Sequence, residues 1–284
     1  MSLSQLNPIN SVLLTLHVTK IRFRILSRYK GWFAFDFIMP IVMAALPILI
    51  GVSVAGGFAS AGNAFKSHTG TSNYVIYMLV GAIVMMTVET SLWLVGSWLR
   101  WEREVGTIES VYLAPARRIQ ILTGVSLYSG IRSVFTFIGS YLLGCLLFGI
   151  NPFEGDMLIA LLFLIAGLAP LWGLGFFYGA FILKVREAGS LMNILAWGMA
   201  FLMGAYYPIT VFPKTLQYIA LAFPPTWITN GVRASLLGLS YFLGAWYWDL
   251  GVLLLYSIIM PLLGVMAFVY VENRIKRNEG VGKF

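Results

Sequence analysis

Residues 157–183 read MLIALLFLIAGLAPLWGLGFFYGAFIL, a run that contains no Asp, Glu, Lys or Arg. A helix needs about 20 apolar residues, at 1.5 Å each, to cross the roughly 30 Å of hydrocarbon in a bilayer. In lipid every backbone N–H and C=O group must find its partner within the segment, so this run predicts a membrane-spanning helix. The run is continuous, whereas the strands of a membrane β-barrel alternate between apolar and polar residues, so a barrel is excluded.

The composition of the whole chain also indicates that most of it lies in lipid. Of the 284 residues, 59% are hydrophobic and 11% are charged, whereas soluble domains have about 45–50% apolar and about 25% charged residues. Such a chain could not cover its surface with polar groups, so most of it must lie in lipid. A net charge of +8 would suggest nucleic acid as a partner of a soluble protein. Here the positions of the basic residues explain the charge, and we predict no nucleic acid partner.

Six stretches are long and apolar enough to cross a bilayer. We therefore predict an all-α integral membrane protein with six transmembrane helices. The predicted spans are 32–56, 73–99, 123–149, 156–183, 190–209 and 246–271. They form one domain over residues 32–284. An N-terminal segment, residues 1–31, precedes this domain.

The basic residues predict the side of the membrane on which each connection lies. Most of the 19 Lys and Arg residues fall in the N-terminal segment, the second and fourth connections and the C-terminal tail. Connections on the cytoplasmic side carry an excess of Lys and Arg. With six crossings, this excess places both termini in the cytoplasm.

Few residues are available for metal, redox or catalytic chemistry. Cys145 is the single cysteine, and His17 and His68 are the only histidines, so we predict neither a disulfide nor a metal site. The sequence has no paired carboxylates, no nucleophile–His pair and no G-x-x-x-x-G-K-[ST] loop for ATP phosphates. We predict no catalytic residues in this chain.

The segment before the first span, over residues 9–30, mixes apolar and basic residues. One helical stripe runs along it and consists of Leu14, Val18, Ile21 and Ile25. A basic amphipathic helix suits a membrane surface, so we predict a helix that lies in the cytoplasmic interface. The alternative is a partly ordered basic arm.

Two apolar pieces too short to cross the membrane lie between the last two spans, in residues 210–245. Helix start and stop residues bound them: Pro213, Pro224, Pro225 and Thr226 at the starts, and Gly238 at the end. Lys214 and Arg233 would each cost about 2.5–3.5 kcal/mol at the bilayer centre. We predict a re-entrant helical hairpin over residues 210–240 that dips into the outer leaflet. The alternative is a surface loop of amphipathic helices.

The second cytoplasmic connection reads WEREVGTIESVYLAP over residues 101–115. Gly106 breaks the charged end of the second span, and Thr107 is a candidate N-cap for a short helix that ends before Pro115. Glu109 would lie in its first turn, where a carboxylate favours the helix dipole. A short acidic helix at the end of a helical hairpin suits docking to a basic groove of another protein. The alternative is a solvated connector.

These two segments resemble the two signatures of the ABC-2 type permease family. The first signature is E-x-G-T-[IL]-E…P…[KR], and this chain matches it with Glu104, Gly106, Thr107, Glu109, Pro115, Arg117 and Arg118. The second lies before the last span, and the similar residues here are Tyr207, Pro208, Phe212, Pro213, Pro224, Pro225, Thr226, Trp227 and Arg233. The number of spans also agrees, so the resemblance covers essentially the whole chain.

The resemblance implies the membrane-spanning permease subunit of an ATP-driven exporter in the plasma membrane of a prokaryote. ATP and Mg²⁺ would bind to a separate ATPase, so this chain itself would hold no cofactor. Two ATPase subunits and a second permease subunit, identical or different, would complete the working unit among membrane lipids. The implied coupling helix covers residues 103–114, and the implied ATPase-coupling residues are Glu102, Arg103, Glu104, Gly106, Thr107, Glu109, Pro115 and Arg186.

Within the family, the segment from Glu104 to Glu109 looks more like permeases for drug or lipid efflux than permeases for O-antigen or teichoic polymers. Trp227 departs from the drug-exporter pattern, in which a tyrosine-type residue is common. We expect a hydrophobic or amphipathic substrate, with a lipid-linked glycan as the alternative. From other classes, an ion-coupled secondary transporter and a membrane sensor that does not transport remain open.

Two sets of residues inside the predicted spans carry further expectations. Glu89 and Arg132 lie about equally deep in neighbouring spans, and we expect an ion pair because intramembrane charges pair or face a cavity. The alternatives are a role in the transport pathway and separate partners. The family resemblance favours a pathway wall in the fifth span, formed by Asn193, Trp197, Met199, Met203 and Tyr206. Ordinary helix packing is the alternative there.

Overall fold

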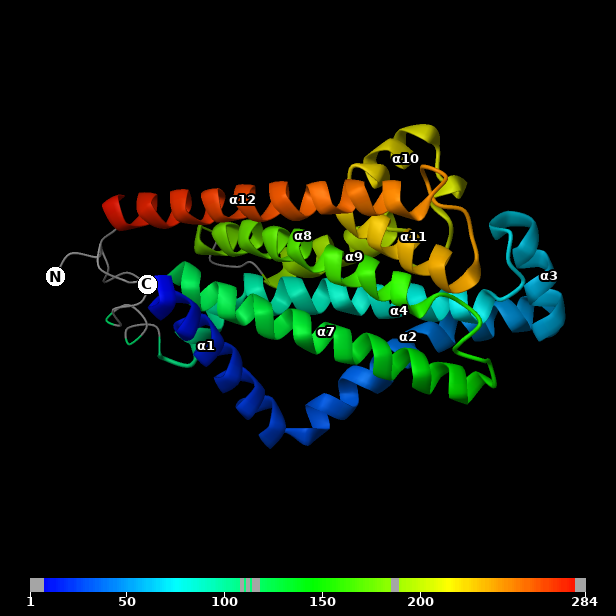
Figure 1. The fold of residues 1–284 in the computed structure, drawn as a ribbon, viewed down its shortest axis with the longest axis horizontal. Helices are drawn as coiled ribbons and strands as arrows, with labels where there is room; N and C mark the ends of the chain where they lie inside the picture. The colour runs from blue at the N-terminus through cyan, green and yellow to red at the C-terminus, as the bar shows by residue number, and fades with distance from the viewer. Residues whose placement is uncertain (1–7, 108–109, 111–112, 114–117, 185–188, 279–284) are drawn as a thin grey trace.

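The computed structural model describes residues 8–107, 110, 113, 118–184 and 189–278. Within these residues it has eleven α-helices and no strand, as the sequence predicts. The long helices lie side by side along one axis (Figure 1). The start of α1 (Pro8–Arg28) and the end of α12 (Trp246–Asn278) lie at one end of the bundle, here called the α5 end after α5 (Trp98–Glu104). α3 (Phe58–Thr69) lies at the other end, here called the α3 end, and α10 (Lys214–Leu221) lies toward it. This arrangement agrees with an even number of crossings.

Five helices are long and apolar enough to cross a membrane. They are α2 (Lys30–Ala55), α4 (Tyr74–Ser91, continued by the π-helix η2, Leu92–Gly96), α7 (Arg118–Phe148), α8 (Met157–Lys184) and α12 (Trp246–Asn278). Of these, α4 with η2 is the central helix, because 78% of its apolar window is buried, against 22% for α2 and 17% for α12. Five of the six predicted spans are therefore confirmed as long apolar helices.

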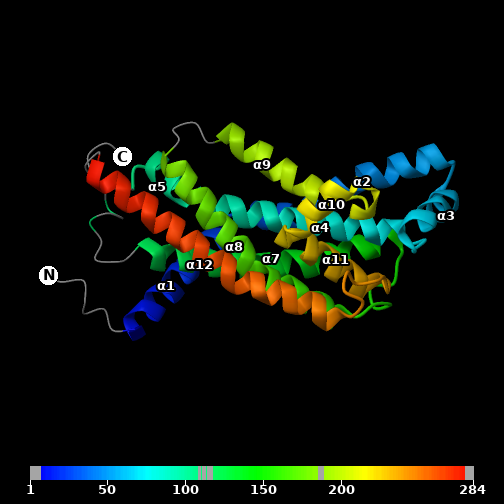
Figure 2. The same ribbon diagram turned by 90° about the horizontal axis from the view of Figure 1, so that it is seen from above.

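The span predicted over residues 190–209 is wrong in its length. The helix there, α9 (Gly189–Leu202), has 14 residues and is about 21 Å long, which is less than the hydrocarbon thickness. It ends because Gly204 takes φ +64°, and the backbone then runs extended at Pro208 into the short 3₁₀ helix η3 (Ile209–Val211). Figure 2 shows that α9 starts apart from α4 at the edge of the bundle and approaches α4 at its end, partway along the bundle.

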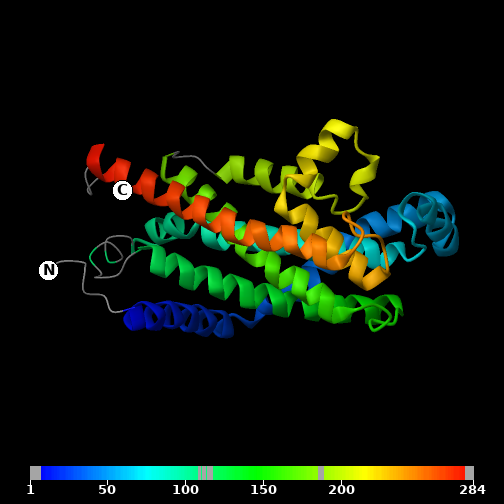
Figure 3. The same ribbon diagram turned by 45° about the horizontal axis from the view of Figure 1, so that its top comes forward.

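The N-terminal helix α1 (Pro8–Arg28) lies along the first turns of α7 (Figure 3). The prediction of a helix rather than a loose arm is confirmed, and Val18 of the predicted apolar stripe packs against the core cluster that includes Leu122 and Val125 of α7. Ile21 and Ile25 are about half exposed, whereas the Thr19 hydroxyl donates to the Gly124 carbonyl of α7 at 2.9 Å. A hydroxyl–carbonyl bond and an apolar contact of Val18 therefore hold α1 against α7.

Three short helices lie at the α3 end. α3 (Phe58–Thr69) follows α2 and is a helix that the sequence did not predict. α10 (Lys214–Leu221) and α11 (Pro224–Leu237) are the two predicted pieces of the external segment. Gly238 ends α11 with φ +64°, so the predicted end is confirmed, whereas the helix begins at Pro224 itself and not after Pro225. Thr226 is not the N-cap, because α11 begins two residues earlier.

The helices approach one another most closely where glycine removes the side chain. A Cβ on Gly173 of α8 would lie 2.6 Å from the backbone nitrogen of Pro261 in α12. Pro261 has no N–H, so it removes a hydrogen bond from its own helix, and the two backbones meet at that point. Small residues at helix contacts are a main source of packing energy in membranes.

We predict that Gly173→Ala lowers the free energy of unfolding by about 1–3 kcal/mol, because the added methyl group meets backbone atoms that cannot move away. Gly251→Ala on α12 is the matched control, since its added Cβ meets nothing within 4 Å. Thermal unfolding of the purified proteins in detergent measures both. If both variants unfold at the same temperature, the close contact does not contribute to stability.

Candidate functional site

Glu102, in α5 (Trp98–Glu104), is the polar centre of the α5 end. Its Oε1 accepts a hydrogen bond from Arg22 Nη2 at 2.8 Å and another from Trp98 Nε1 at 2.9 Å. Its Oε2 accepts the Thr107 hydroxyl at 2.5 Å, and its carbonyl oxygen accepts the Thr107 N–H at 2.9 Å. One carboxylate therefore joins α1, α5 and the start of the connection that follows.

The break that the sequence predicts at Gly106 is confirmed. This residue has φ +77°, in the left-handed region that a side chain disfavours. Between Thr107 and the start of α7 only Ser110 and Leu113 are described, and both are helical and exposed. Three of the predicted coupling residues lie outside the described residues: Glu109, Pro115 and Arg186. The side chain of Arg103 is likewise outside them.

Further ion pairs surround this end. Arg100 Nε lies 2.7 Å from Glu104 Oε1, one turn along α5, and both side chains are partly exposed. Arg118, at the start of α7, pairs with Glu272, near the end of α12, and both side chains are largely buried. The buried pair ties two spans together, whereas the exposed pair on α5 leaves charged groups open to solvent or a partner.

Inside the bundle, the expected Glu89–Arg132 ion pair is wrong. Arg132 of α7 instead pairs with Asp36 of α2, with Nε to Oδ2 at 2.5 Å and Nη2 to Oδ1 at 2.6 Å. Such a two-point contact fixes both the distance and the orientation of the groups. Depth alone did not identify the partner, because α2 and α4 both contact α7. Among the described residues Glu89 forms no ion pair.

The predicted pathway residues do not share one face. Asn193 and Trp197 on α9 are exposed. Met203 is 1% exposed, and Met199 and Tyr206 pack against the same core. The Tyr206 hydroxyl lies 3.8 Å from Met85 Sδ of α4. The inward residues therefore hold the end of α9 against α4, and a role in a pathway stays a prediction for the outward ones.

Arg233 of α11 is the main polar anchor of the α3 end, and it is 4% exposed. Its Nε donates to the Tyr77 carbonyl of α4 at 3.1 Å, its Nη1 to the Gly204 carbonyl at 2.7 Å, and its Nη2 to the Ala205 carbonyl. The guanidinium carbon also lies 3.7 Å from the centre of the Tyr77 ring, within cation–π range. Burial lowers the pKa of Arg233, although arginine stays protonated in proteins.

This anchor depends on a glycine. A Cβ on Gly81 of α4 would collide with the Ala205 carbonyl and with the Arg233 guanidinium. The absence of a side chain at Gly81 therefore lets α4, α11 and the turn after α9 meet at one point.

Trp227 packs on the other side of the α10–α11 hairpin. Its Nε1 donates to the Leu221 carbonyl at the end of α10 at 2.7 Å, and its ring packs edge-on against Phe242. Pro224 and Pro225 are buried at the start of α11, and Pro213 precedes α10. The predicted pair of short helices is therefore one packed unit, and its depth in a membrane stays a prediction.

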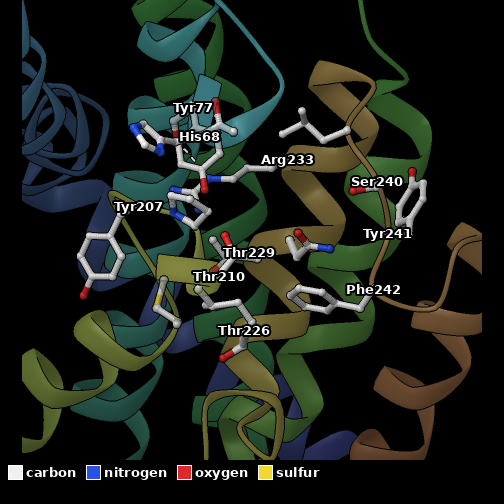
Figure 4. Close-up of a pocket in the computed structure, with 16 residues that line it drawn as sticks. His68, Tyr77, Tyr207, Thr210, Thr226, Thr229, Arg233, Ser240, Tyr241 and Phe242 are labelled. Carbon is white, nitrogen blue, oxygen red and sulfur yellow. Dashed lines mark hydrogen bonds between the residues drawn. The ribbon is translucent and has the colours of Figure 1, made fainter. Parts of the chain in front are cut away.

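A pocket of about 340 Å³ lies beside Arg233 (Figure 4). Its polar lining residues include His68, Thr210, Thr229, Asn230, Arg233 and Ser240. Ser240, Tyr241 and Phe242 lie on one side, and His68 and Tyr207 lie on the other. Pro208, from the predicted signature, lines it as well.

Several of these site residues could not be found from the sequence. Asp36 is the only acidic residue in the first span, and this was the available signal for a partner of Arg132. Arg22, His68 and Gly81 carried no such signal, because each meets its partner through a contact between segments far apart in the chain.

The fold is that of a multi-pass helical membrane protein, with polar networks at both ends of a buried central helix. The family model of the ABC-2 type transporter matches residues 18–237. The chain therefore belongs to the ABC-2 type transporter family and is a permease component, in a family whose permeases lack an ATPase domain and work with an ATPase partner. Among curated proteins, no match to this chain was found.

We predict that Arg132→Met costs about 3–5 kcal/mol of stability, because it leaves the Asp36 carboxylate buried without its partner. Asp36→Leu combined with Arg132→Met should recover most of that loss, since no buried charge then remains. Thermal unfolding of the two single variants and the double variant in detergent gives the coupling energy.

Glu89→Gln combined with Arg132→Met is the control for that cycle. It should be as unstable as Arg132→Met alone, because Glu89 is not the partner. A recovery of stability in this combination, and none with Asp36→Leu, would contradict the pairing.

Proposed function

We propose that the chain is the permease subunit of an ATP-driven exporter that moves a hydrophobic or amphipathic compound, such as a drug or a lipid, from the cytoplasm or inner leaflet. The observation that carries this proposal is the family match over residues 18–237. The Glu102 network adds a physical route by which a partner could act on the bundle. The working unit would contain two ATPase subunits and a second permease subunit.

The route runs along α4. The connection that follows Gly106 is held to α5 by Glu102, and η2 joins α5 to α4. A π-helix is a point at which helix register shifts, and such bulges are frequent at functional sites. At its other end α4 accepts the hydrogen bond of Arg233 through the Tyr77 carbonyl. A force on the connection would therefore reach the α10–α11 hairpin through one buried helix.

Surface chemistry supports the proposed partners. The outward charges of Arg100 and Glu104 suit a polar contact with an ATPase subunit. Much of α2 is apolar and exposed, including Leu46 at 65% and Val54 at 84%, as expected of a helix that contacts lipid or a second permease subunit. In this proposal α9 and the non-helical residues that follow it, up to η3 at residue 209, together complete the sixth crossing, and both termini lie in the cytoplasm of a prokaryotic cell.

The proposed substrate class is based on the exposed side chains of α9. Ile194, Trp197 and Phe201 are between 50% and 67% exposed there, which gives this helix an apolar and aromatic outer face. Such a face suits a hydrophobic or amphipathic substrate better than a strongly hydrated polymer. Glu89, without an ion-pair partner in the described chain, is the polar group of α4 that we assign to the pathway.

We predict that Glu102→Gln lowers ATP-driven transport of a fluorescent phospholipid or dye by about tenfold, because a neutral amide holds Arg22 and Thr107 less tightly than a carboxylate does. Arg22→Gln should reproduce the loss from the other side of the contact. Transport is measured in vesicles that contain the wild-type or variant permease with its ATPase partner, with copurification as the check on assembly.

The matched control for this experiment is Glu154→Gln, which removes an exposed carboxylate at the α3 end and should leave transport unchanged. If the wild-type complex moves no amphiphile when ATP is supplied, the exporter proposal is wrong. If it moves amphiphiles and both network variants transport normally, the proposed route through Glu102 is wrong while the exporter proposal stands.

The topology gives a separate test. Cys145 is the single cysteine and is buried, so introduced cysteines are labelled against a low background. Ser67→Cys on α3 should react with an impermeant maleimide in intact cells, and Ser110→Cys should react only after the membrane is opened. Labelling of Ser110→Cys from outside would reverse the proposed orientation.

A further inference from the structure

The pocket beside Arg233 carries a positive charge that no carboxylate balances. Arg233 and His68 are its basic lining residues, and neither Asp nor Glu lines it in the described part of the chain. Arg233 makes no ion pair in that part. Its three hydrogen bonds go to neutral carbonyl groups, which supply dipoles but no net negative charge.

The acidic residue behind the pocket wall is already engaged. Asp249 is fully buried, and it accepts the backbone N–H groups of Phe242 and Leu243 at 2.9 Å each. Its carboxylate therefore binds the segment that forms the pocket wall, and Asp249 does not line the pocket. The guanidinium of Arg233 remains the nearest full charge to the pocket space, in surroundings of low polarity where a charge acts strongly.

The remaining lining adds donors on one side and apolar surface on the other. Ser240 and Thr210 offer exposed hydroxyl groups, and His68 offers an imidazole. Met203 and Phe242 present apolar surface to the same space. The pocket thus has a cationic, donor-rich region next to apolar walls, and its size is at the lower end of the range for ligand sites, about 300–1,000 Å³.

We infer that this pocket binds the phosphate-bearing head group of an amphiphile, with the phosphate facing Arg233 and the first part of the hydrocarbon against Met203 and Phe242. A phosphate offers several acceptor oxygens to donors from different directions, which suits an arginine and hydroxyl groups on separate segments. The inference goes beyond the proposed function, because binding at this site requires neither ATP nor the ATPase partner.

Arg233 itself is a poor residue to vary, since its loss would leave three carbonyl groups without a donor and separate α11 from α4. The exposed rim is better suited. His68→Glu and Ser240→Glu each bring a negative charge to the pocket, from α3 and from the segment after α11. Ser67→Glu is the matched control, because Ser67 is the exposed neighbour of His68 and does not line the pocket.

Isothermal titration calorimetry on the full chain in neutral detergent tests the inference with three probes: dihexanoyl phosphatidic acid, dihexanoyl phosphatidylcholine and inorganic phosphate. We expect the anionic lipid to bind at least about tenfold more tightly than the zwitterionic one. His68→Glu and Ser240→Glu should each weaken its binding about tenfold, since like charges placed together oppose binding. Ser67→Glu should bind it as the wild type does.

Inorganic phosphate distinguishes the two sources of the ligand. If it displaces the lipid, the site recognises the phosphate group alone, and if it does not, the hydrocarbon is part of the recognised ligand. Both results support a head-group site. Equal affinity for the two lipids, or an equal loss of affinity in Ser67→Glu and His68→Glu, would overturn the inference, and gel filtration of each variant excludes misfolding as the cause.

Discussion

Helices inside a bilayer gain little from hiding apolar surface from one another, because lipid is as apolar as they are. This bundle is therefore held by close backbone contacts at glycines and by buried polar contacts between helices. Gly173 brings the backbones of α8 and α12 together, and the Asp36–Arg132 pair joins α2 to α7. Each contact works at one position along the helix axis only, so these contacts also fix the register of the bundle.

The central helix α4 links the two polar ends of the molecule. At one end α5 continues it to Glu102, which holds α1 and the start of the connection after Gly106. At the other end the Tyr77 carbonyl and the space above Gly81 receive Arg233. A helix buried along most of its length cannot shift alone, so movement at either end must involve its neighbours. This is a physical basis for communication between a partner and the α10–α11 hairpin.

Sequence reasoning predicted helix type and boundaries well where local signals are strong. Five spans, the break at Gly106 and the end of α11 were found because apolar length and glycine act within a few residues. It failed where the partner lies far away in the chain. Arg132 was paired with the wrong carboxylate, and α9 was predicted too long because its apolar character continues past the turn at Gly204.

The sequence by itself determined that this chain lies in lipid, forms helices and carries the two segments typical of ABC-2 permeases. These properties follow from composition and from the local conformational limits of glycine and proline. The packing of the helices then adds that Glu102 binds Arg22, that Asp36 balances Arg132, and that Arg233 lies beside a pocket whose lining, among the described residues, contains no Asp or Glu. Those pairings depend on which helices are neighbours and at what depth, and hydropathy does not specify either.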